Sequence, residues 1–182
     1  MDWKTLASKI GFEDRWLKYR VDTCEMPDGT IIDPYYVLEY PDWAAALALT
    51  EDRQVILVKI YRHGLGKTVL EIPGGALDEN GESPESAIRR ELLEETGYAF
   101  EKIIKTAVVS PNPSNHSNLF HAFLAVGGKK IQEQELDEEE EIEVVLVSLP
   151  EFEQMLKNNE LIQAMHVTAA YYGLQNLSTN LS

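Results

Sequence analysis

The sequence predicts an α+β fold for a chain of 182 residues. Three observations support this class: strand-like segments fill the first half, a charged helical stretch follows a glycine turn in the middle, and two helical segments close the chain. Strands that precede helices, rather than alternating with them regularly, are typical of α+β proteins. With 44% hydrophobic residues, the chain has the composition of a globular domain with a substantial core.

Aromatic and β-branched residues mark four predicted strands in the first half, at 16–26, 35–40, 43–50 and 54–62. A turn with Pro and Gly follows the first strand, and residues 51–53 are predicted to form a hairpin turn. The first two strands can form a small sheet apart from the others. We therefore expect a β-rich N-terminal segment over 1–42 and a main domain over 43–182.

A short helix is predicted after the glycine turn. Ser83 is a good N-cap, and Pro84 occupies the first helical position, where a missing N–H leaves no bond unmade. Gly97 can adopt the left-handed conformation that ends a helix. Ile88 and Leu92 are four residues apart, so they can bury one side of the helix in a core.

The other side of this helix gathers acidic residues. Glu91 and Glu95 are four apart and Glu94 is three from Glu91, so their carboxylates crowd together. Like charges at that spacing destabilise an isolated helix. Such a cluster favours a hard divalent cation, since Mg²⁺ is typically held by a few carboxylates, waters and substrate phosphates. The alternative is a surface helix with solvated glutamates.

The next two predicted strands are 103–110 and 119–126. The loop between them is rich in Pro, Asn and Ser, which are common in any loop. Ser114 and Asn115 also offer short hydrogen-bonding groups, and loops on a rigid scaffold often carry recognition. No zinc site is expected at His116 or His121, because no further His or Cys lies at ligand spacing.

An acidic run and two helices make up the last part of the chain. The run at 132–141 leads into an apolar strand; it reads as a solvated loop, in which one or two glutamates could serve a divalent metal. The sequence Ser148–Glu151 is a capping box that opens an amphipathic helix. A last helix is predicted over 161–174, followed by a frayed tail at 178–182.

Charge and cysteine content restrict the partners and the compartment. The formal net charge of −15 argues against a nucleic-acid polymer or an anionic membrane, because both are held largely by Lys and Arg. An anionic ligand would need positive charge from another source, which a bound cation supplies. Cys24 is the single cysteine, and the N-terminus lacks the apolar core of a signal peptide, so we expect a soluble, cytoplasmic protein.

The stretch from Leu70 to Tyr98 resembles the signature of the Nudix hydrolase superfamily, G-x5-E-x7-R-E-U-x-E-E-x-G-U, where U is aliphatic or aromatic. The nine matching positions are Gly75, Glu82, Arg90, Glu91, Leu92, Glu94, Glu95, Gly97 and Tyr98. The spacing departs once, because six residues rather than five separate Gly75 from Glu82. The extra residue falls in the loop and leaves the spacing of the helix intact.

The resemblance implies an α/β/α sandwich with a mixed sheet and a metal-dependent pyrophosphatase. Two metal ions roughly 3.5–4 Å apart can clamp the attacking and leaving oxygens of a diphosphate. In the catalytic site, Arg90 together with Glu82 would orient the glutamates. The groups that would hold Mg²⁺, or Mn²⁺ in its place, are Glu91, Glu95, Glu94 and a backbone carbonyl of Gly74 or Gly75.

Residues 15–175 look most like the branch of ADP-ribose and nucleoside-diphosphate-sugar pyrophosphatases. The likeness rests on the strand-rich N-terminus, YR before a loop, EIPGG entering the signature and the late acidic loop. In that branch, glutamates of the acidic loop act as base and extra ligand, which implies Glu138 as base and Glu140 as ligand, in a register ambiguous by at least one residue. The implied reaction splits a nucleoside diphosphate sugar, ADP-ribose included, into a nucleoside monophosphate and a sugar phosphate.

The same likeness implies a homodimer with exchanged N-terminal segments, whose strands line the substrate site. Arg62 could fork onto a phosphate, although an arginine at a strand end is often a solvated edge charge. The residues that could stack on the base, if they do not serve the sheet core or a dimer interface, are Trp16, Tyr19, Tyr35 and Tyr36. Two alternatives stay open: hydrolysis of another nucleotide, such as a nucleoside triphosphate, a dinucleoside polyphosphate or NADH, and a nucleotide-sugar sensor without turnover.

Overall fold

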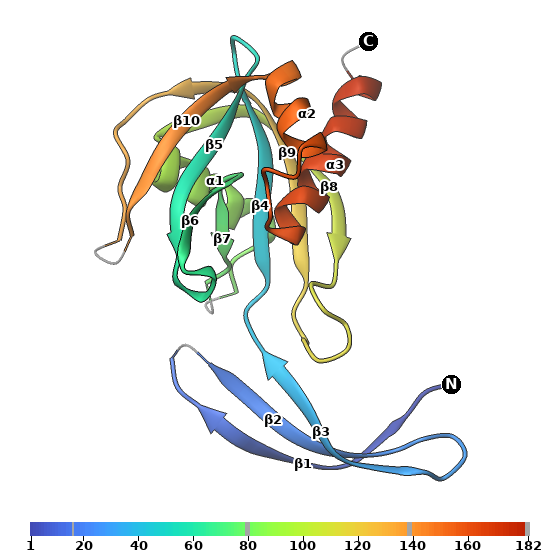
Figure 1. The fold of residues 1–182 in the computed structure, drawn as a ribbon. Helices are drawn as coiled ribbons and strands as arrows, with labels where there is room; N and C mark the ends of the chain where they lie inside the picture. The colour runs from blue at the N-terminus through green and yellow to red at the C-terminus, as the bar shows by residue number, and fades with distance from the viewer. Residues whose placement is uncertain (16, 79–80, 138–139, 181–182) are drawn as a thin grey trace. The chain divides into compact units, whose positions relative to one another are not determined.

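The computed structural model describes residues 1–15, 17–78, 81–137 and 140–180. The chain divides into two compact units, each with its own sheet (Figure 1). The first unit is Met1–Pro41 with Ser110–Leu119, and the second is Asp42–Val109 with Phe120–Ser182. The second segment of the first unit is the Pro-, Asn- and Ser-rich loop in which the sequence places Ser114 and Asn115.

A three-stranded antiparallel sheet, blue in Figure 1, forms most of the first unit. Its strands, in sheet order, are β1 (Lys4–Glu13), β2 (Lys18–Glu25) and β3 (Ile31–Glu39). The sequence predicts the second and third of these strands but not β1. Every residue of β1 is exposed, so its sequence lacks the buried alternation that marks a strand.

The segment Ser110–Leu119 lies beside β3 within the first unit. The backbone N–H of Leu38 donates to the carbonyl of Asn115 at 2.7 Å, and the carbonyl of Leu38 accepts from the N–H of Ser117 at 3.1 Å. These two hydrogen bonds fix the backbone in the middle of the loop to β3. The positions from which the loop's polar side chains project are therefore defined.

The second unit is built on a seven-stranded sheet in which β4 and β9 are parallel and the other described pairs are antiparallel. The five strands of its main path are, in order, β10 (Ile142–Ser148), β5 (Gln54–Arg62), β4 (Trp43–Thr50), β9 (Phe120–Lys130) and β8 (Tyr98–Val109). Two short strands complete it: β6 (Lys67–Glu71) pairs with β5, and β7 (Gly74–Ala76) pairs with β4.

The glycine turn occupies a part of the sheet where β4 does not pair with β5. β4 pairs with β5 only at Ala48 and Leu49, near the hairpin turn. At its other end, β4 pairs with β7 instead, with Ala45 opposite Gly74. The backbone of the glycine turn therefore belongs to the sheet, which holds it rigidly next to the helix that follows.

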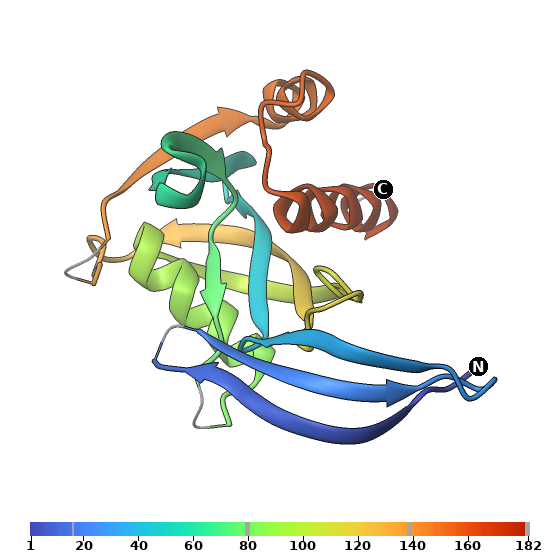
Figure 2. The same cartoon turned by 60° about the horizontal axis from the view of Figure 1, so that its bottom comes forward.

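Helices cover both faces of this sheet (Figure 2). On one face, Ile88 and Leu92 of α1 (Pro84–Thr96) pack with apolar residues such as Phe123. On the other face, α2 (Leu149–Lys157) and α3 (Ala164–Asn180) contribute to a second core. The predicted α+β class and the α/β/α sandwich with a mixed sheet are thereby confirmed. None of the helices in the described ranges is long and apolar enough to cross a bilayer.

Several predicted boundaries differ from the structure. The strand predicted from residue 103 already begins at Tyr98. The last helix begins at Ala164 rather than residue 161 and continues through Asn180, so the prediction of a frayed tail is wrong for residues 178–180. Strands β6 and β7 were not predicted, because five and three residues are too short to display a periodicity.

Candidate active site

Local capping rules position the acidic helix as the sequence predicts. The hydroxyl of Ser83 accepts a hydrogen bond from the N–H of Ser86 at 3.1 Å, and Gly97 ends α1 in a left-handed conformation with φ 76°. Because Ile88 and Leu92 are fully buried, the rotation of the helix about its axis is fixed. The glutamates on its other side are held toward the glycine turn.

Two of these glutamates meet the backbone of the glycine turn. The carboxylate of Glu95, only 6% exposed, accepts a hydrogen bond from the N–H of Gly74 at 2.8 Å. The carboxylate of Glu91 lies against Gly75, where a Cβ would come within 2.4 Å of its Oε1 atom. Position 75 must therefore be glycine for Glu91 to keep this place.

Arg90 connects the remaining acidic side chains. Its Nε and Nη2 atoms donate to the carboxylate of Glu82 at 3.2 and 3.1 Å, and its Nη1 atom donates to Glu91 at 2.9 Å and to Glu94 at 3.0 Å. Nη2 also donates to the carbonyl of Ala76 at 3.2 Å. The guanidinium thus fixes two carboxylates of α1 to the loop that precedes the helix.

Burial changes the acidity of the two glutamates at the glycine turn. It raises the pKa of Glu91 to about 7, against the opposing effect of Arg90, and it raises the pKa of Glu95 to about 8, with further repulsion from Glu91 and Glu140. Ionising these buried carboxylates without a counter-ion is unfavourable. A bound cation would relieve that cost.

The chemistry of this donor set fits a hard divalent ion. Carboxylate and carbonyl oxygens are its preferred ligands, and Mg²⁺ usually keeps several waters, so that one or two carboxylates suffice. Among the described residues, no three His, Cys, Asp or Glu side chains form a complete metal cage. Arg90 engages the carboxylates of Glu91 and Glu94, and the carboxylate of Glu95 accepts from Gly74. Glu91 and Glu95, which meet the glycine turn, are the side chains that could contribute carboxylate oxygens to such an ion.

The acidic loop is attached to this site by residues that the sequence analysis did not single out. The side-chain amide of Gln134 donates to the carbonyls of Glu95 at 2.6 Å and Ile142 at 3.1 Å, and the N–H of Glu135 donates to the carbonyl of Glu94 at 2.9 Å. Gln134 looks like any polar loop residue in the sequence, so only tertiary structure reveals its role.

Of the two glutamates predicted in this loop, one can be placed. The side chain of Glu140 is exposed, and its charge contributes to the raised pKa values of Glu91 and Glu95. Glu140 therefore lies within electrostatic range of both proposed ligands. The predicted base, Glu138, lies outside the described residues.

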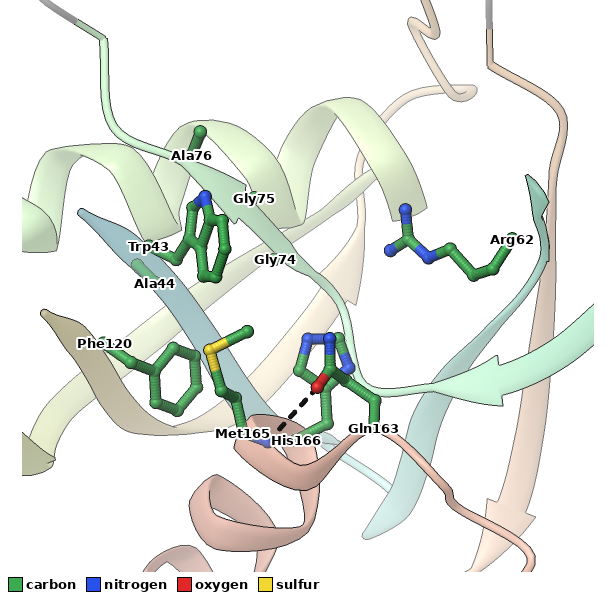
Figure 3. A pocket seen from close by; sticks show the side chains of 10 residues that line it. All are labelled: Trp43, Ala44, Arg62, Gly74, Gly75, Ala76, Phe120, Gln163, Met165 and His166. Carbon is green, nitrogen blue, oxygen red and sulfur yellow. Dashed lines mark hydrogen bonds between the residues drawn. The ribbon is translucent and has the colours of Figure 1, made fainter. Parts of the chain in front are cut away.

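A pocket of about 270 Å³ adjoins the glycine turn in the second unit (Figure 3). Arg62 lies on one side of it, and its Nε and Nη2 atoms donate to the carboxylate of Glu71 at 3.1 and 2.7 Å. The lining residues come from β4, β5, β7, β9, the beginning of α3 and the residue before it: Trp43, Ala44, Arg62, Gly74, Gly75, Ala76, Phe120, Gln163, Met165 and His166. Arg62 and the backbone of Gly74 or Gly75 were predicted for the site. The other lining residues were not, because no motif marks a pocket formed by distant elements.

The other predicted substrate residues belong to the first unit. The Tyr35 hydroxyl donates to the carbonyl of Ser114, next to Asn115, so the structure brings these three residues together. The ring of Tyr19 lies 6.2 Å from that of Tyr36, and both lie on neighbouring strands of the small sheet. Trp16 lies outside the described residues.

A three-layer domain in which a capped helix carries two glutamates to a glycine turn, with an arginine that binds one of them and two further glutamates, defines a Nudix-type hydrolase domain by its fold and site. The chain belongs to the NUDIX family, since the model of the NUDIX domain matches residues 40–166. A second model, the nucleoside diphosphate sugar hydrolase N-terminal domain, matches residues 3–38. Nudix hydrolases are generally dependent on divalent metal ions.

Similar proteins cover nearly the whole chain. An ADP-ribose pyrophosphatase of Bacillus subtilis (strain 168) is 34% identical over 173 residues, which are 94% of this chain and 92% of that protein. A methanol dehydrogenase activator of Bacillus methanolicus is 32% identical over 170 residues, covering 93% and 91%. The crystal structure of an ADP compounds hydrolase superposes with a TM-score of 0.86 over 98% of this chain and 96% of that one, at 21% identity, which shows a shared fold.

Proposed function

We propose that the chain hydrolyses the diphosphate linkage of nucleoside diphosphate sugars, ADP-ribose among them, to a nucleoside monophosphate and a sugar phosphate. The observation that carries the proposal is the meeting of Glu91 and Glu95 with the glycine turn under the control of Arg90. The match to an N-terminal domain of nucleoside diphosphate sugar hydrolases, and the relatives named ADP-ribose pyrophosphatase, support this substrate class.

In the proposed reaction, side chains of this chain hold the divalent ion, orient the substrate and accept a proton. Glu91 and Glu95 would bind the ion, proposed to be Mg²⁺ with Mn²⁺ as a substitute. Glu94 and Glu140 are proposed as further ligands, because the charges of both raise the pKa of Glu91. When bound, the ion neutralises phosphate oxygens and acidifies water. Arg90 keeps the carboxylates from separating. Arg62 binds a phosphate oxygen through the edge of its guanidinium that Glu71 leaves open.

The bond changes are those of a simple hydrolysis. Water attacks one phosphorus, a P–O bond of the anhydride breaks, and the leaving phosphate carries away the electron pair. Glu138 of the acidic loop is proposed to take the proton of the attacking water. That role rests on the family resemblance and on the attachment of the loop to α1 through Gln134.

The first unit is proposed to recognise the nucleoside and to form a homodimer. Tyr19, Tyr35 and Trp16 offer aromatic faces for the base, and Ser114 with Asn115 offers hydrogen bonds. Support for a dimer comes from exposed apolar side chains on β1, where Leu6 is 53% and Ile10 51% exposed. The single Cys24 is compatible with the proposed cytoplasmic location.

A product panel tests the proposal. The purified chain is incubated with Mg²⁺ or Mn²⁺ and with ADP-ribose, other nucleoside diphosphate sugars, NADH, a dinucleoside polyphosphate and nucleoside triphosphates, and products are separated by chromatography. We expect a nucleoside monophosphate and a sugar phosphate from the first two classes. Preferential cleavage of another class would reassign the substrate, and no cleavage of any compound with either metal would favour a sensor.

A further inference from the structure

A histidine at the beginning of α3 contacts the buried carboxylate that forms an ion pair with Arg62. His166 is 6% exposed, and its Nδ1 atom lies 3.4 Å from Oε2 of Glu71, which is 2% exposed. Both carboxylate oxygens of Glu71 accept hydrogen bonds from Arg62. Glu71 thus joins Arg62 to His166, and both of these residues line the pocket, together with apolar residues such as Phe120.

The protonation of His166 follows from this environment. Burial lowers the pKa of the ring to about 4, against the opposing effect of Glu71 and with a smaller contribution from Arg62, so the imidazole is neutral at pH 7. A neutral imidazole has one N–H group, and an ionised carboxylate only accepts. We therefore assign the proton to Nδ1, which lies 3.4 Å from the Glu71 oxygen and, in the described part of the chain, makes no hydrogen bond.

Arg62 keeps donors that Glu71 does not use. Its Nε and Nη2 atoms are engaged, whereas Nη1 donates to no residue that the structure describes. The guanidinium charge also interacts with Glu95 and Glu140, which places it within electrostatic range of the metal-binding carboxylates. Figure 3 shows the side chain reaching from β5 toward the strand that carries Gly74.

We propose that His166 is a positioning residue: through Glu71 it fixes the guanidinium of Arg62 in the orientation that binds a substrate phosphate. This inference rests on the proposed function. Glu71 precedes Gly74 by three residues, so the same carboxylate also lies on the strand that enters the glycine turn. If the N–H of His166 is lost, the carboxylate can rotate and the guanidinium moves with it. Small misplacements of a positioning group weaken catalysis strongly.

Three substitutions of His166 distinguish a role in positioning Arg62 from a role in packing. His166→Asn places an amide nitrogen near the original Nδ1, His166→Gln places one near Nε2, and His166→Phe keeps the ring without any donor. We expect His166→Asn to retain kcat/KM for ADP-ribose within about threefold, and the other two to lose about tenfold, mainly through KM. Equal losses in the Asn and Gln variants would overturn the proposal, and these two remain informative if the Phe variant does not fold.

A double-mutant cycle with Arg62→Ala identifies the route of the effect. If His166 acts through Arg62, adding His166→Gln to Arg62→Ala should change kcat/KM by less than about twofold. Additive losses would mean that His166 acts on stability or on the pocket directly, and would overturn the inference. A normal kcat/KM for Arg62→Ala alone would remove Arg62 from the proposed substrate site, and the positioning role with it.

A measurement that needs no turnover tests the positioning role of His166 independently of the proposed function. The Nε–H resonance of Arg62, observed by NMR on ¹⁵N-arginine-labelled full-length chain, reports the order of the guanidinium. We expect it to be rigid in the unaltered chain and in His166→Asn, and mobile in His166→Gln. If the unaltered chain hydrolyses no substrate, the proposed function fails while this test still decides whether His166 orders Arg62; unchanged mobility would exclude that ordering.

Discussion

Two arginines flank the glycine turn, and they use their donors in opposite ways. Arg90 contacts three carboxylates and one carbonyl, so its guanidinium is saturated. Arg62 contacts one buried carboxylate and keeps Nη1 unengaged among the described residues. The difference teaches that charge alone does not define a role: a saturated arginine orders the protein's own ligands, whereas a half-engaged one remains able to bind an anion.

The largest expected effect concerns the carboxylates that Arg90 organises. Glu95→Gln should lower kcat by about 10³-fold, because the side chain loses a formal charge at the metal site. Since the folded protein raises the pKa of Glu95 to about 8, the folded state keeps a proton that the unfolded state loses above pH 4.5. Stability of the metal-free protein therefore falls as pH rises between these values, and Glu95→Gln should unfold at a higher temperature than the unaltered chain at pH 8.

Steady-state kinetics and calorimetry without metal check this pair of outcomes. Glu85→Gln is the matched control, because Glu85 lies on the same helix in an exposed pair with Arg89. It should change neither kcat nor the melting temperature appreciably. Near-normal turnover of Glu95→Gln would exclude Glu95 from the metal site.

Substitution of the two arginines should change different kinetic constants. Arg90→Gln should weaken the apparent affinity for Mg²⁺ by about 10- to 100-fold, because it frees the carboxylates that the guanidinium orders. Arg62→Gln should leave metal affinity within about threefold and raise KM for ADP-ribose instead. Metal titrations at saturating substrate and substrate titrations at saturating metal measure both. Identical signatures for the two variants would end the distinction between them.

Metal binding should depend on pH through the two buried glutamates. A cation must displace protons from Glu91, with a pKa of about 7, and from Glu95, with a pKa of about 8. Affinity for Mn²⁺ should therefore rise by more than about tenfold from pH 6 to pH 8 and level off above that range. Calorimetry in two buffers of different ionisation enthalpy should detect proton release at pH 7. Release of no protons would mean that both side chains are already ionised.

A further expected effect lies on the Arg62 side; it concerns stability rather than activity and appears in acid. Burial lowers the pKa of His166 to about 4, below its ordinary 6.5, so between these values the unfolded state binds the extra proton. This contribution to the free energy of unfolding is fully present above pH 6.5 and falls by about 3 kcal/mol as pH decreases to 4. Between pH 6.5 and 4, the free energy of unfolding measured with urea should fall less for His166→Gln than for the unaltered chain. His63→Gln, at an exposed histidine, is the control and should follow the unaltered chain.

Local rules explain why some of the site could be predicted. The caps at Ser83 and Gly97 and the spacing of Ile88 and Leu92 depend only on near neighbours in the chain, and the structure confirms them. The crowding of Glu91 and Glu95 on one side of the helix follows from the same geometry. These features required no knowledge of distant segments.

The parts that could not be predicted depend on contacts between distant segments. Glu71 reads in the sequence as an ordinary polar residue of a strand, and its burial is set by pairing with Arg62 and by α3. Strand β1 has no buried face, so its pairing with β2 leaves no pattern in its composition. His166 lies in a predicted helix, but only the packing of that helix on the sheet brings it to Glu71.

The amide of Gln134 has a consequence for how such enzymes can diversify. By joining the last turn of α1 to the first residue of β10, it fixes both ends of the intervening acidic segment. Changes of length or order between these anchors would alter the reach of its glutamates without disturbing α1, the helix that is proposed to hold the ion. The group that accepts the proton can thus differ in position between related chains while the helix and its glutamates stay the same.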